Sequence, residues 1–224
     1  PSSKWGSNDM SNDICNDICN DICNGKTFRD WDERYADSHY LFGTKPNDFL
    51  KSVADSLAPH SRVLCLADGE GRNGVYLATL GHRVTAADQS RVGLQKAKKL
   101  AEKKQVSIET LEADLSEHDL GVESWDCIVS IFFHIPTEVR AHIYPRIITA
   151  LKPGGILILE SYTPAQLKHG TGGPPRAALM LTKNELAQYF SGMKIEHLEE
   201  LEREVIEGTG HTGLASVVQL LAQR

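Results

Sequence analysis

The apolar positions of the chain change period from one segment to the next. Short, nearly continuous apolar runs are typical of buried strands, and segments with the helical spacing of three and four residues follow them. The runs that predict strands are residues 62–67, 82–88, 106–114, 125–133 and 156–162. The segments that predict helices are residues 72–81, 91–104 and 136–151, the last with Pro145 as a candidate kink. Strands that alternate with helices predict an α/β fold with a parallel sheet and right-handed crossovers.

Both flanks of this alternating region have a different pattern. Residues 27–58 contain several aromatic residues and predict a short helix, a loop and a second helix. After the fifth strand comes a loop rich in Gly and Pro, and then a helix for which Thr182 and Glu185 predict a capping box. The last two segments, residues 194–208 and 213–223, have strand patterns joined by a short Gly-containing loop, which predicts an antiparallel hairpin. The first of them is also compatible with a helix by composition.

Residues 1–26 are polar and contain the tetrapeptide NDIC three times in a row. On a helix, Cys15, Cys19 and Cys23 would line one face beside carboxylates, and such a ligand set can bind a thiophilic metal. The alternative is a duplicated low-complexity tail that stays disordered. This alternative is favoured because Asn and Asp are poor helix formers and no fourth ligand is evident. Residues 1–9 precede a methionine and are interpreted as a vector remnant.

Residues 27–224 are expected to form a single domain, with residues 27–58 as an N-terminal lid segment. The 224-residue chain has a formal net charge of −6 and no basic run, so no nucleic-acid partner is expected. No apolar run reaches the roughly 20 residues of a membrane helix and no secretory signal is recognisable, so no membrane association is expected. The five cysteines are an odd number, and Cys65 and Cys127 lie in predicted strands. A disulfide framework is therefore not expected, and a cytoplasmic location is.

The stretch GEGRNG follows the first predicted strand and opens a helix, as in a nucleotide-binding G-x-G-x-x-G loop. Gly69 and Gly71 allow positive φ and a close approach of the backbone to a ligand. Asp88 ends the second strand, 19 residues after Gly69, where a carboxylate can accept hydrogen bonds from ribose or cap the next helix. Asp114 ends the third strand, where it can accept a hydrogen bond from an adenine amino group. Dinucleotide enzymes and S-adenosylmethionine enzymes both use this arrangement, but the chain has no second mononucleotide-binding half.

Several stretches of the chain together resemble one family. They are WDERY, YLFGTKPNDFL, VLCLADGEGRNGVYLATLGHRVTAADQS, ADL, WDCIVSIFFHIP, LKPGG and LESYTPAQL. On these residues, the chain from about Phe28 onward resembles a class I S-adenosylmethionine-dependent methyltransferase of the tellurite-resistance/thiopurine methyltransferase-like group. The resemblance implies S-adenosylmethionine as the cofactor. It also implies a doubly wound, mostly parallel seven-stranded sheet of the Rossmann-like methyltransferase fold, whose final antiparallel hairpin places one strand between two others.

The same resemblance implies the cofactor contacts. They fall on Ala67, Asp68, Gly69, Glu70 and Gly71 in the loop, on Asp88 and Gln89 for ribose, on Asp114 and Leu115 for adenine, and on Ser130 to His134 beside the sulfonium. The chain departs from the family where Cys65 replaces a frequent acidic residue and Ala67 replaces Gly. The usual carboxylate partner of the methionine amino group is thus missing, and Asp68 or a backbone carbonyl is expected to replace it.

Candidate residues for the acceptor lie at the ends of the fourth and fifth strands and in the flanking segments. His134 is a candidate general base or substrate contact, with packing as the alternative. The other candidates are Tyr40, Tyr162 and Glu160, with Arg34, Arg176 and Arg203 for an anionic group. Glu160 equally fits a pair with an arginine, and each of the three arginines is expected to be a solvated surface charge rather than a substrate contact. His211 is expected to be a residue of the hairpin loop.

Two segments are expected to fold over the cofactor as lids. They are the aromatic residues Trp31, Tyr35, Tyr40 and Phe42, and the loop over residues 163–181.

The chemistry implied by the resemblance is an in-line displacement at a sulfonium carbon, which depends on alignment in a dry pocket and requires no metal. No metal site is expected outside the cysteine repeat. The sequence therefore predicts methyl transfer to a small molecule, with a thiol or a selenium or tellurium species as candidate acceptors. The alternatives are a protein or RNA methyltransferase, which the acidic charge disfavours, and a dinucleotide-dependent oxidoreductase. The sequence gives no indication of the oligomeric state.

Overall fold

Seven strands form one sheet in the order β3-β2-β1-β4-β5-β7-β6, in a computed structural model that describes residues 30–224. Strands β1 to β5 are parallel, and β7 is antiparallel to both of its neighbours, β5 and β6. The strands are β1 (Arg62–Leu66), β2 (Arg83–Asp88), β3 (Glu109–Glu112), β4 (Trp125–Ile131), β5 (Leu151–Tyr162), β6 (Lys194–Glu207) and β7 (His211–Gln223). The predicted mostly parallel seven-stranded sheet with a final antiparallel hairpin is confirmed.

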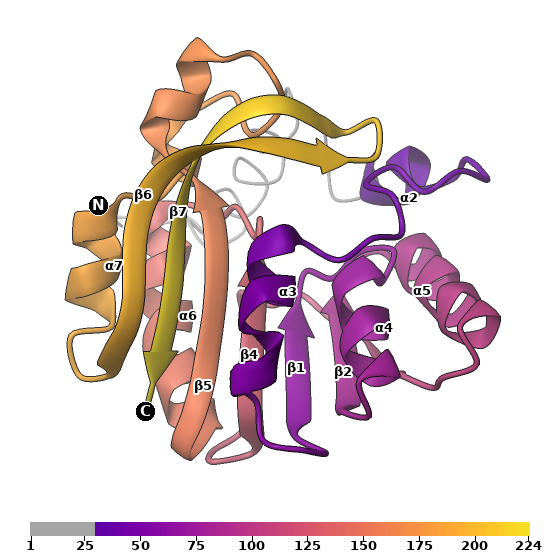
Figure 1. The fold of residues 1–224 in the computed structure, drawn as a ribbon, viewed down its shortest axis with the longest axis horizontal. Coiled ribbons are helices and arrows are strands. Elements are labelled where there is room, and N and C mark those ends of the chain that lie inside the picture. The colour runs from indigo at the N-terminus through magenta and orange to yellow at the C-terminus, as the bar shows by residue number, and fades with distance from the viewer. Residues whose placement is uncertain (1–29) are drawn as a thin grey trace, which may run out of the picture.

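Helices cover both faces of the sheet (Figure 1). One face carries α3 (Asp48–Val53), α4 (Arg72–Thr79) and α5 (Arg91–Lys103), and the other carries α6 (Thr137–Ala150) and α7 (Lys183–Tyr189). Helix α2 (Asp30–Arg34) packs against α5 near the carboxyl edge of the sheet. Short 3₁₀ helices occur at Ala54–Ser56, Pro164–Lys168 and Ala177–Leu179, the last two inside the Gly/Pro-rich loop.

The apolar run of β1 is continuous because each face of the strand meets a different core. Val63 and Cys65 pack into the cluster formed with α3 and α4. Leu64 and Leu66 pack into the cluster formed with α6 and α7. The sheet is therefore buried on both sides in its centre, and the site can form only at the edge where its strands end.

Side-chain caps mark the starts of α7 and α3. Thr182 and Glu185 form the predicted capping box at the start of α7. The side chain of Asn47 caps α3 by accepting a hydrogen bond from the backbone N–H of Leu50. Helix α6 continues through Pro145 to Ala150.

Strand β5 begins earlier than the predicted fifth strand, because the stretch LKPGG, residues 151–155, lies inside it. Trp125 pairs with Leu151 and Cys127 pairs with Ile156, so β5 bulges over residues 152–155. Gly154 has φ +80° there, a left-handed conformation that glycine adopts without strain.

The final hairpin of β6 and β7 extends beyond the end of the neighbouring strand β5. Strand β7 pairs with β5 from Val217 to Gln223, whereas its residues 211–216 pair with β6 alone. In Figure 1 this free part of the hairpin curves over the carboxyl edge of the sheet toward α2. The segment over residues 194–207 is a strand, so its helix-compatible composition is overridden by the pairing with β7.

No helix within residues 30–224 combines the length and apolar character needed to cross a membrane. The predictions for residues 1–26, including the repeat with Cys15, Cys19 and Cys23, lie outside the described residues.

Candidate active site

The chain leaves β1 toward β2 on one side, and β4 later joins β1 on the other side. Ligands bind outside the carboxyl ends of the strands at such a switch point. A cavity lies at this edge, between the loop after β1, the ends of β2 and β3, the segment after β4, the N-terminal residues and the hairpin. The predicted site residues that line it are Ala67, Asp68, Gly69, Glu70, Asp88, Gln89, Asp114, Leu115 and His134.

The loop after β1 adopts left-handed backbone conformations that explain its glycines. Gly69 has φ +54° and Gly71 has φ +84°. A Cβ atom on Gly69 would lie 2.6 Å from the hydroxyl oxygen of Tyr35, and one on Gly71 would lie 2.5 Å from Cβ of Ala97. Ala67, where the family usually has Gly, also has a positive φ of +51° and therefore carries backbone strain.

Asp88 joins the loop to the end of β2. Its Oδ2 atom accepts a hydrogen bond from the backbone N–H of Gly69 at 2.8 Å, and its Oδ1 atom accepts one from the N–H of Ser90 at 2.8 Å. Asp88 is only 6% exposed, and burial raises its pKa to about 6 although these hydrogen bonds oppose the shift. Ser90 itself caps α5 by accepting from the N–H of Gly93. Asp88 therefore fixes the loop, and the hydroxyl of Ser90 caps the helix.

Asp68 lines the cavity, three positions after Cys65, the position at which the resemblance implies an acidic residue. It accepts a hydrogen bond from the backbone N–H of Gly74 at 3.1 Å, and burial raises its pKa to about 7. Cys65 is enclosed within β1, and burial raises the pKa of its thiol well above the usual value. Cys65 therefore offers no charge to a ligand, whereas Asp68 does.

The ends of β2 and β3 form the opposite end of the cavity. Gln89, Asp114 and Leu115 line it there. The Oδ1 atom of Asp114 accepts hydrogen bonds from the backbone N–H and the hydroxyl of Ser116, at 2.9 and 2.6 Å, which fix the orientation of the carboxylate. Ser130 differs from expectation: it lies within β4 between Leu66 and Leu159, and the lining starts one residue later.

Aromatic rings enclose the end of the cavity beyond β4. Phe132 stacks on Tyr162 with ring centroids 4.6 Å apart, and the ring of His134 lies 5.5 Å from Tyr162. Phe42 from the N-terminal segment lies 4.6 Å from the ring of His211. His134, His211 and the two phenylalanines line the cavity, whereas Tyr162 is fully buried behind them. Tyr162 is therefore a support for Phe132 and His134 rather than part of the lining.

Both histidines of this end are held in the neutral state. Burial, followed by the influence of His211, lowers the pKa of His134 to about 3. Burial also lowers the pKa of His211, although Glu207 opposes that shift. The prediction that His211 is a loop residue is wrong: it is the first residue of β7, paired with Glu207 across the hairpin.

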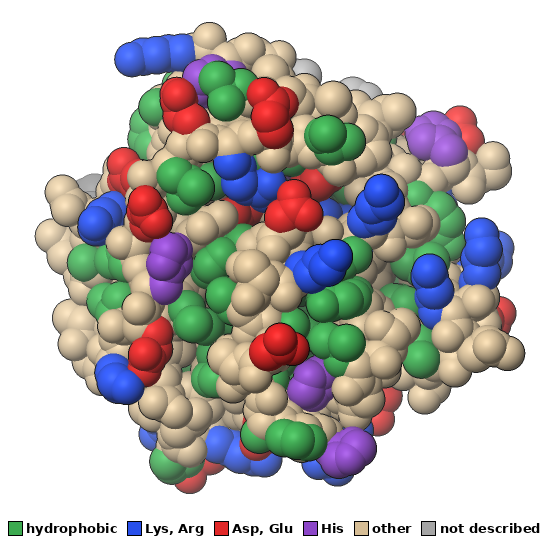
Figure 2. All heavy atoms as spheres, viewed as in Figure 1, with side chains coloured by type: hydrophobic (Ala, Val, Ile, Leu, Met, Phe, Trp, Pro, Cys, Tyr) green, Lys and Arg blue, Asp and Glu red, His purple; other side chains and the backbone are tan. Residues whose placement is uncertain are grey.

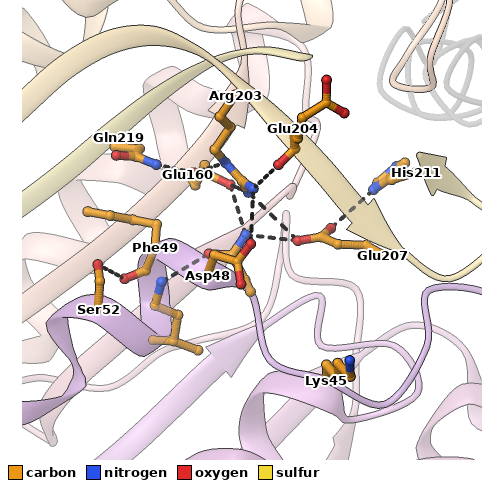
Figure 3. A network of polar contacts seen from close by, with 12 residues as sticks. Lys45, Asp48, Phe49, Ser52, Glu160, Arg203, Glu204, Glu207, His211 and Gln219 are labelled. Atoms are coloured by element: carbon orange, nitrogen blue, oxygen red, sulfur yellow. Dashed lines mark hydrogen bonds and ion pairs between the residues drawn. The ribbon is translucent and has the colours of Figure 1, made fainter. Parts of the chain in front are cut away.

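A buried polar network lies directly beneath the hairpin (Figure 3). Glu160, which is completely buried, accepts hydrogen bonds from Arg203, Gln219 and Asn47. The Nδ2 atom of Asn47 lies 2.8 Å from Oε1 of Glu160 and 3.0 Å from Oε1 of Glu207. The expected pair of Glu160 with an arginine is confirmed. The surface position expected for Arg203 is wrong, because the curved hairpin carries its guanidinium inward.

Glu207 connects this network to the cavity. Its Oε2 atom lies 2.8 Å from Nη2 of Arg72 and 3.5 Å from Nδ1 of His211, and Arg72 and His211 both line the cavity. Burial acts to raise the pKa of Glu207, but the hydrogen bond from His211 and the charge of Arg72 outweigh it and lower the pKa to about 2. Figure 2 shows side chains of both charge signs side by side between the hairpin and α3. The guanidinium of Arg72, which lines the cavity, is thus already paired with the carboxylate of Glu207.

Three further candidates lie away from the cavity lining. Tyr40 packs beside α5, where its hydroxyl donates a hydrogen bond to the carbonyl of Lys96 at 3.1 Å. The guanidinium of Arg34 lies 4.3 Å from the ring centroid of Trp31, and Arg176 is exposed in the Gly/Pro-rich loop. Of the expected lid residues, Trp31, Tyr35 and Phe42 line the cavity. Within residues 30–224, no group of three or more His, Cys, Asp or Glu side chains is arranged to hold a metal ion.

The comparison with known proteins agrees with this geometry. A family model described as "Methyltransferase domain" matches residues 63–155, which include the loop after β1 and the ends of β2, β3 and β4. Residues 63–155 thus match a methyltransferase domain, and the comparisons support a class I S-adenosylmethionine-dependent methyltransferase. The cofactor of that family is S-adenosylmethionine, and the cavity is lined by Asp68, Asp88 and Asp114, which the resemblance assigns to the cofactor.

Three curated relatives bear on the function of this methyltransferase. The uncharacterized methyltransferase YbaJ of Bacillus subtilis is 35% identical over 100 residues, covering 43% of this chain and 38% of YbaJ. The tRNA 5-carboxymethoxyuridine methyltransferase of Escherichia coli is 28% identical, covering 61% of this chain and 56% of that protein. The thiopurine S-methyltransferase of Pseudomonas putida is 26% identical, covering 77% of this chain and 86% of that protein. The chain thus spans only about half of the first two relatives, or less.

Solved structures confirm the fold of this methyltransferase. A structure described as "Conversion of a Disulfide Bond into a Thioacetal Group during Echinomycin Biosynthesis" has a TM-score of 0.72 at 17% identity, covering 88% of this chain and 91% of the other. TehB from Haemophilus influenzae has a TM-score of 0.66 at 21% identity, covering 89% of this chain and 68% of the TehB chain. Together with the thiopurine relative, they confirm the resemblance to the tellurite-resistance/thiopurine methyltransferase-like group.

Proposed function

We propose that this protein transfers a methyl group from S-adenosylmethionine to a small acceptor that carries no anionic group besides its reacting atom. The observation that carries the proposal is the continuity of one cavity from the glycine loop to the aromatic end. The groups suited to the cofactor lie at Gly69, Asp88 and Asp114, and the space for an acceptor lies against Phe132 and His211. A cofactor and a small acceptor would therefore share one enclosed chamber.

The chain's residues fit the cofactor in distinct ways. Asp88, already oriented by two backbone hydrogen bonds, is suited to accept from ribose hydroxyls, and Asp114 is suited to accept from the adenine amino group. Asp68 is suited to hold the ammonium of the methionine part, because an opposite charge would stabilise its ionised form. When bound, S-adenosylmethionine supplies an electrophilic methyl group on a positively charged sulfur. The aromatic walls exclude water and align the acceptor.

The charges at the acceptor end disfavour an anionic substituent on the acceptor. His134 and His211 are neutral, and Arg72 is paired with Glu207 at 2.8 Å. An anionic substituent would thus enter a buried site to which residues 30–224 contribute no free cation, which is unfavourable. This supports a thiol, or an uncharged selenium analogue, over oxyanions such as tellurite and selenite.

A macromolecular acceptor is the alternative, since one relative is named as a tRNA methyltransferase. The net charge of −6 opposes binding to a polyanion, and Trp31, Tyr35 and Phe42 wall the cavity from the N-terminal side. The thiopurine relative, matched over more of both chains, favours a small sulfur acceptor.

The test is a methyl-transfer panel with thiophenol, 4-mercaptobenzoate, selenite, tellurite and bulk tRNA. We expect thiophenol to be preferred over 4-mercaptobenzoate, the same ring with a carboxylate, by about 10-fold or more in kcat/KM, because the charge is buried unpaired. The variant Glu207→Gln removes the ion-pair partner of Arg72, so it should decrease the ratio of kcat/KM for thiophenol to kcat/KM for 4-mercaptobenzoate. Preferred methylation of tRNA or of tellurite would contradict the proposal.

A further inference from the structure

Glu70, the residue between the two glycines of the loop, makes contacts that a cofactor ligand does not need. Its Oε2 atom accepts a hydrogen bond from the backbone N–H of Leu41 at 2.8 Å. Its Oε1 atom forms an ion pair with Nζ of Lys96. Both oxygens thus point to groups outside the loop, and the carboxylate connects the loop to the N-terminal segment and to α5.

Lys96 is a buried lysine, 8% exposed, on a helix whose neighbouring lysines are exposed. Its Nζ atom donates hydrogen bonds to three backbone carbonyls, those of Tyr35 at 3.2 Å, Asp37 at 2.8 Å and His39 at 2.6 Å. An ammonium group has three protons, so the three carbonyls already use its full donor capacity, and Glu70 adds an ion pair. Lysine is almost never this buried unless it is paired, so the position has a specific role.

The segment gathered by Lys96 forms a wall of the cavity. We call residues 31–43 the roof, because Trp31, Tyr35, Phe42 and Gly43 line the cavity from that side. The carbonyl of Leu41 accepts hydrogen bonds from the N–H groups of Thr209 and Gly210 at the hairpin turn, at 2.9 and 3.0 Å.

One residue, Leu41, therefore joins the two covers of the cavity to the cofactor loop. Its N–H group contacts Glu70, its carbonyl contacts the hairpin, and the next residue, Phe42, contacts His211. After helix α2, residues 35–43 contain a turn, with the N–H of Gly43 donating to the carbonyl of Tyr40 at 3.0 Å, but no regular helix or strand. The position of residues 35–43 therefore depends on side-chain and hairpin contacts, among them those of Glu70 and Lys96.

We propose that Glu70 and Lys96 form a latch that positions the roof over the acceptor end of the cavity. The inference rests on the proposed function, since it takes this cavity as the shared chamber of cofactor and acceptor. The latch places Phe42 against His211 and ties the order of the roof to the order of the glycine loop. Lys96 and Glu70 are thus positioning residues, and they act on the acceptor through Leu41 and Phe42.

The test compares three variants of the full chain. Lys96→Met alone leaves the buried carboxylate of Glu70 without its ion-pair partner and can impair folding. The double variant Lys96→Met/Glu70→Gln removes both charges with nearly the same volumes, so it opens the latch without an orphaned charge. Lys98→Met, on the exposed side of the same helix, is the matched control.

For the double variant we expect hydrogen exchange to accelerate about 10-fold or more at residues 35–43 and to stay unchanged in β4. We expect the KM for a thiol acceptor to rise about 10-fold, with kcat changed by less than about 3-fold, because the reacting groups remain in place. Lys98→Met should match the wild type in each measurement. Unchanged exchange and KM in the double variant, or a loss of protection that extends equally through β4, would overturn the latch. Failure of the wild type to bind S-adenosylhomocysteine would instead overturn the proposed function.

Discussion

The substitution Asp88→Asn tests the cofactor site at one atom. The amide has nearly the same shape as the carboxylate, but one of its two oxygen positions becomes a donor and its charge is lost. In the wild type the two oxygens already accept from the N–H groups of Gly69 and Ser90 at 2.8 Å, so the carboxylate is oriented before a ligand arrives. The charge-assisted hydrogen bond to ribose is the interaction that the substitution removes from binding.

The magnitude follows from that bond. A hydrogen bond to a charged group contributes about 1.5–3 kcal/mol, so the Kd for S-adenosylhomocysteine should rise about 10- to 150-fold. Burial raises the pKa of Asp88 to about 6, so the ionised carboxylate destabilises the folded protein as the pH rises through about 6. At pH 8 the asparagine removes the destabilisation caused by the buried negative charge, and this gain offsets the backbone hydrogen bond that the substitution loses. The unfolding free energy without ligand should therefore stay nearly unchanged, while the affinity for S-adenosylhomocysteine falls.

The assay is calorimetric titration with S-adenosylhomocysteine at pH 8 and pH 5.5, with thermal unfolding as the check on folding. The wild-type affinity should weaken toward pH 5.5 as Asp88 takes up a proton, whereas the affinity of Asp88→Asn should depend less on pH. Asp119→Asn is the matched control, because its exposed carboxylate also accepts a backbone hydrogen bond, from Gly121 at 2.9 Å, outside the cavity. An unchanged Kd in a folded Asp88→Asn protein would refute the reasoning.

Three more predictions follow from the site and the sequence. Asp68→Asn should raise the ligand-free unfolding free energy at pH 8 by on the order of 1–3 kcal/mol, because the raised pKa of about 7 means that the ionised carboxylate destabilises the folded state. The same variant should bind S-adenosylhomocysteine more weakly. Thermal unfolding and calorimetric titration measure the two effects, and a lower unfolding free energy at pH 8 would contradict the prediction. His211→Gln should lower kcat/KM about 100-fold for a thiol of high pKa and much less for a thiol that is already ionised. The reason is that a neutral histidine beside Glu207 can act as a general base and accept the thiol proton. Equal losses of kcat/KM on both thiols would exclude a general-base role for His211. Deleting residues 1–25 should leave thiol methylation intact, because that segment has too little apolar surface to offset its ordering entropy; a selective loss on a metalloid acceptor would instead indicate a capture site.

The sequence predicts the elements that depend on neighbouring residues. The G-x-G loop, the capping box at Thr182 and the placement of Asp88 at a strand end are local patterns, and the structure contains each of them. The family resemblance adds the strand order, which no local pattern determines. The sequence is therefore sufficient to name candidate cofactor contacts, which are residues 67–71, 88, 89, 114 and 115.

The residues that sequence reasoning misjudged depend on long-range geometry. Arg203 looks like a surface charge in a charge-rich strand, but the curvature of the hairpin carries it to Glu160, 43 positions earlier. His211 looks like a turn residue, but it begins the strand that overhangs the cavity. Lys96 looks like part of a basic helix face, and only the course of residues 35–41 over α5 makes it buried. Such contacts carry no sequence period, so periodicity does not reveal them.

Calorimetric titration of the wild-type protein with S-adenosylhomocysteine and, separately, with NAD tests the central claim most directly. The family, the left-handed loop at Gly69 and the carboxylates of Asp88 and Asp114 predict saturable binding of one S-adenosylhomocysteine per chain and no measurable binding of NAD. Saturable NAD binding without a response to S-adenosylhomocysteine would contradict the account.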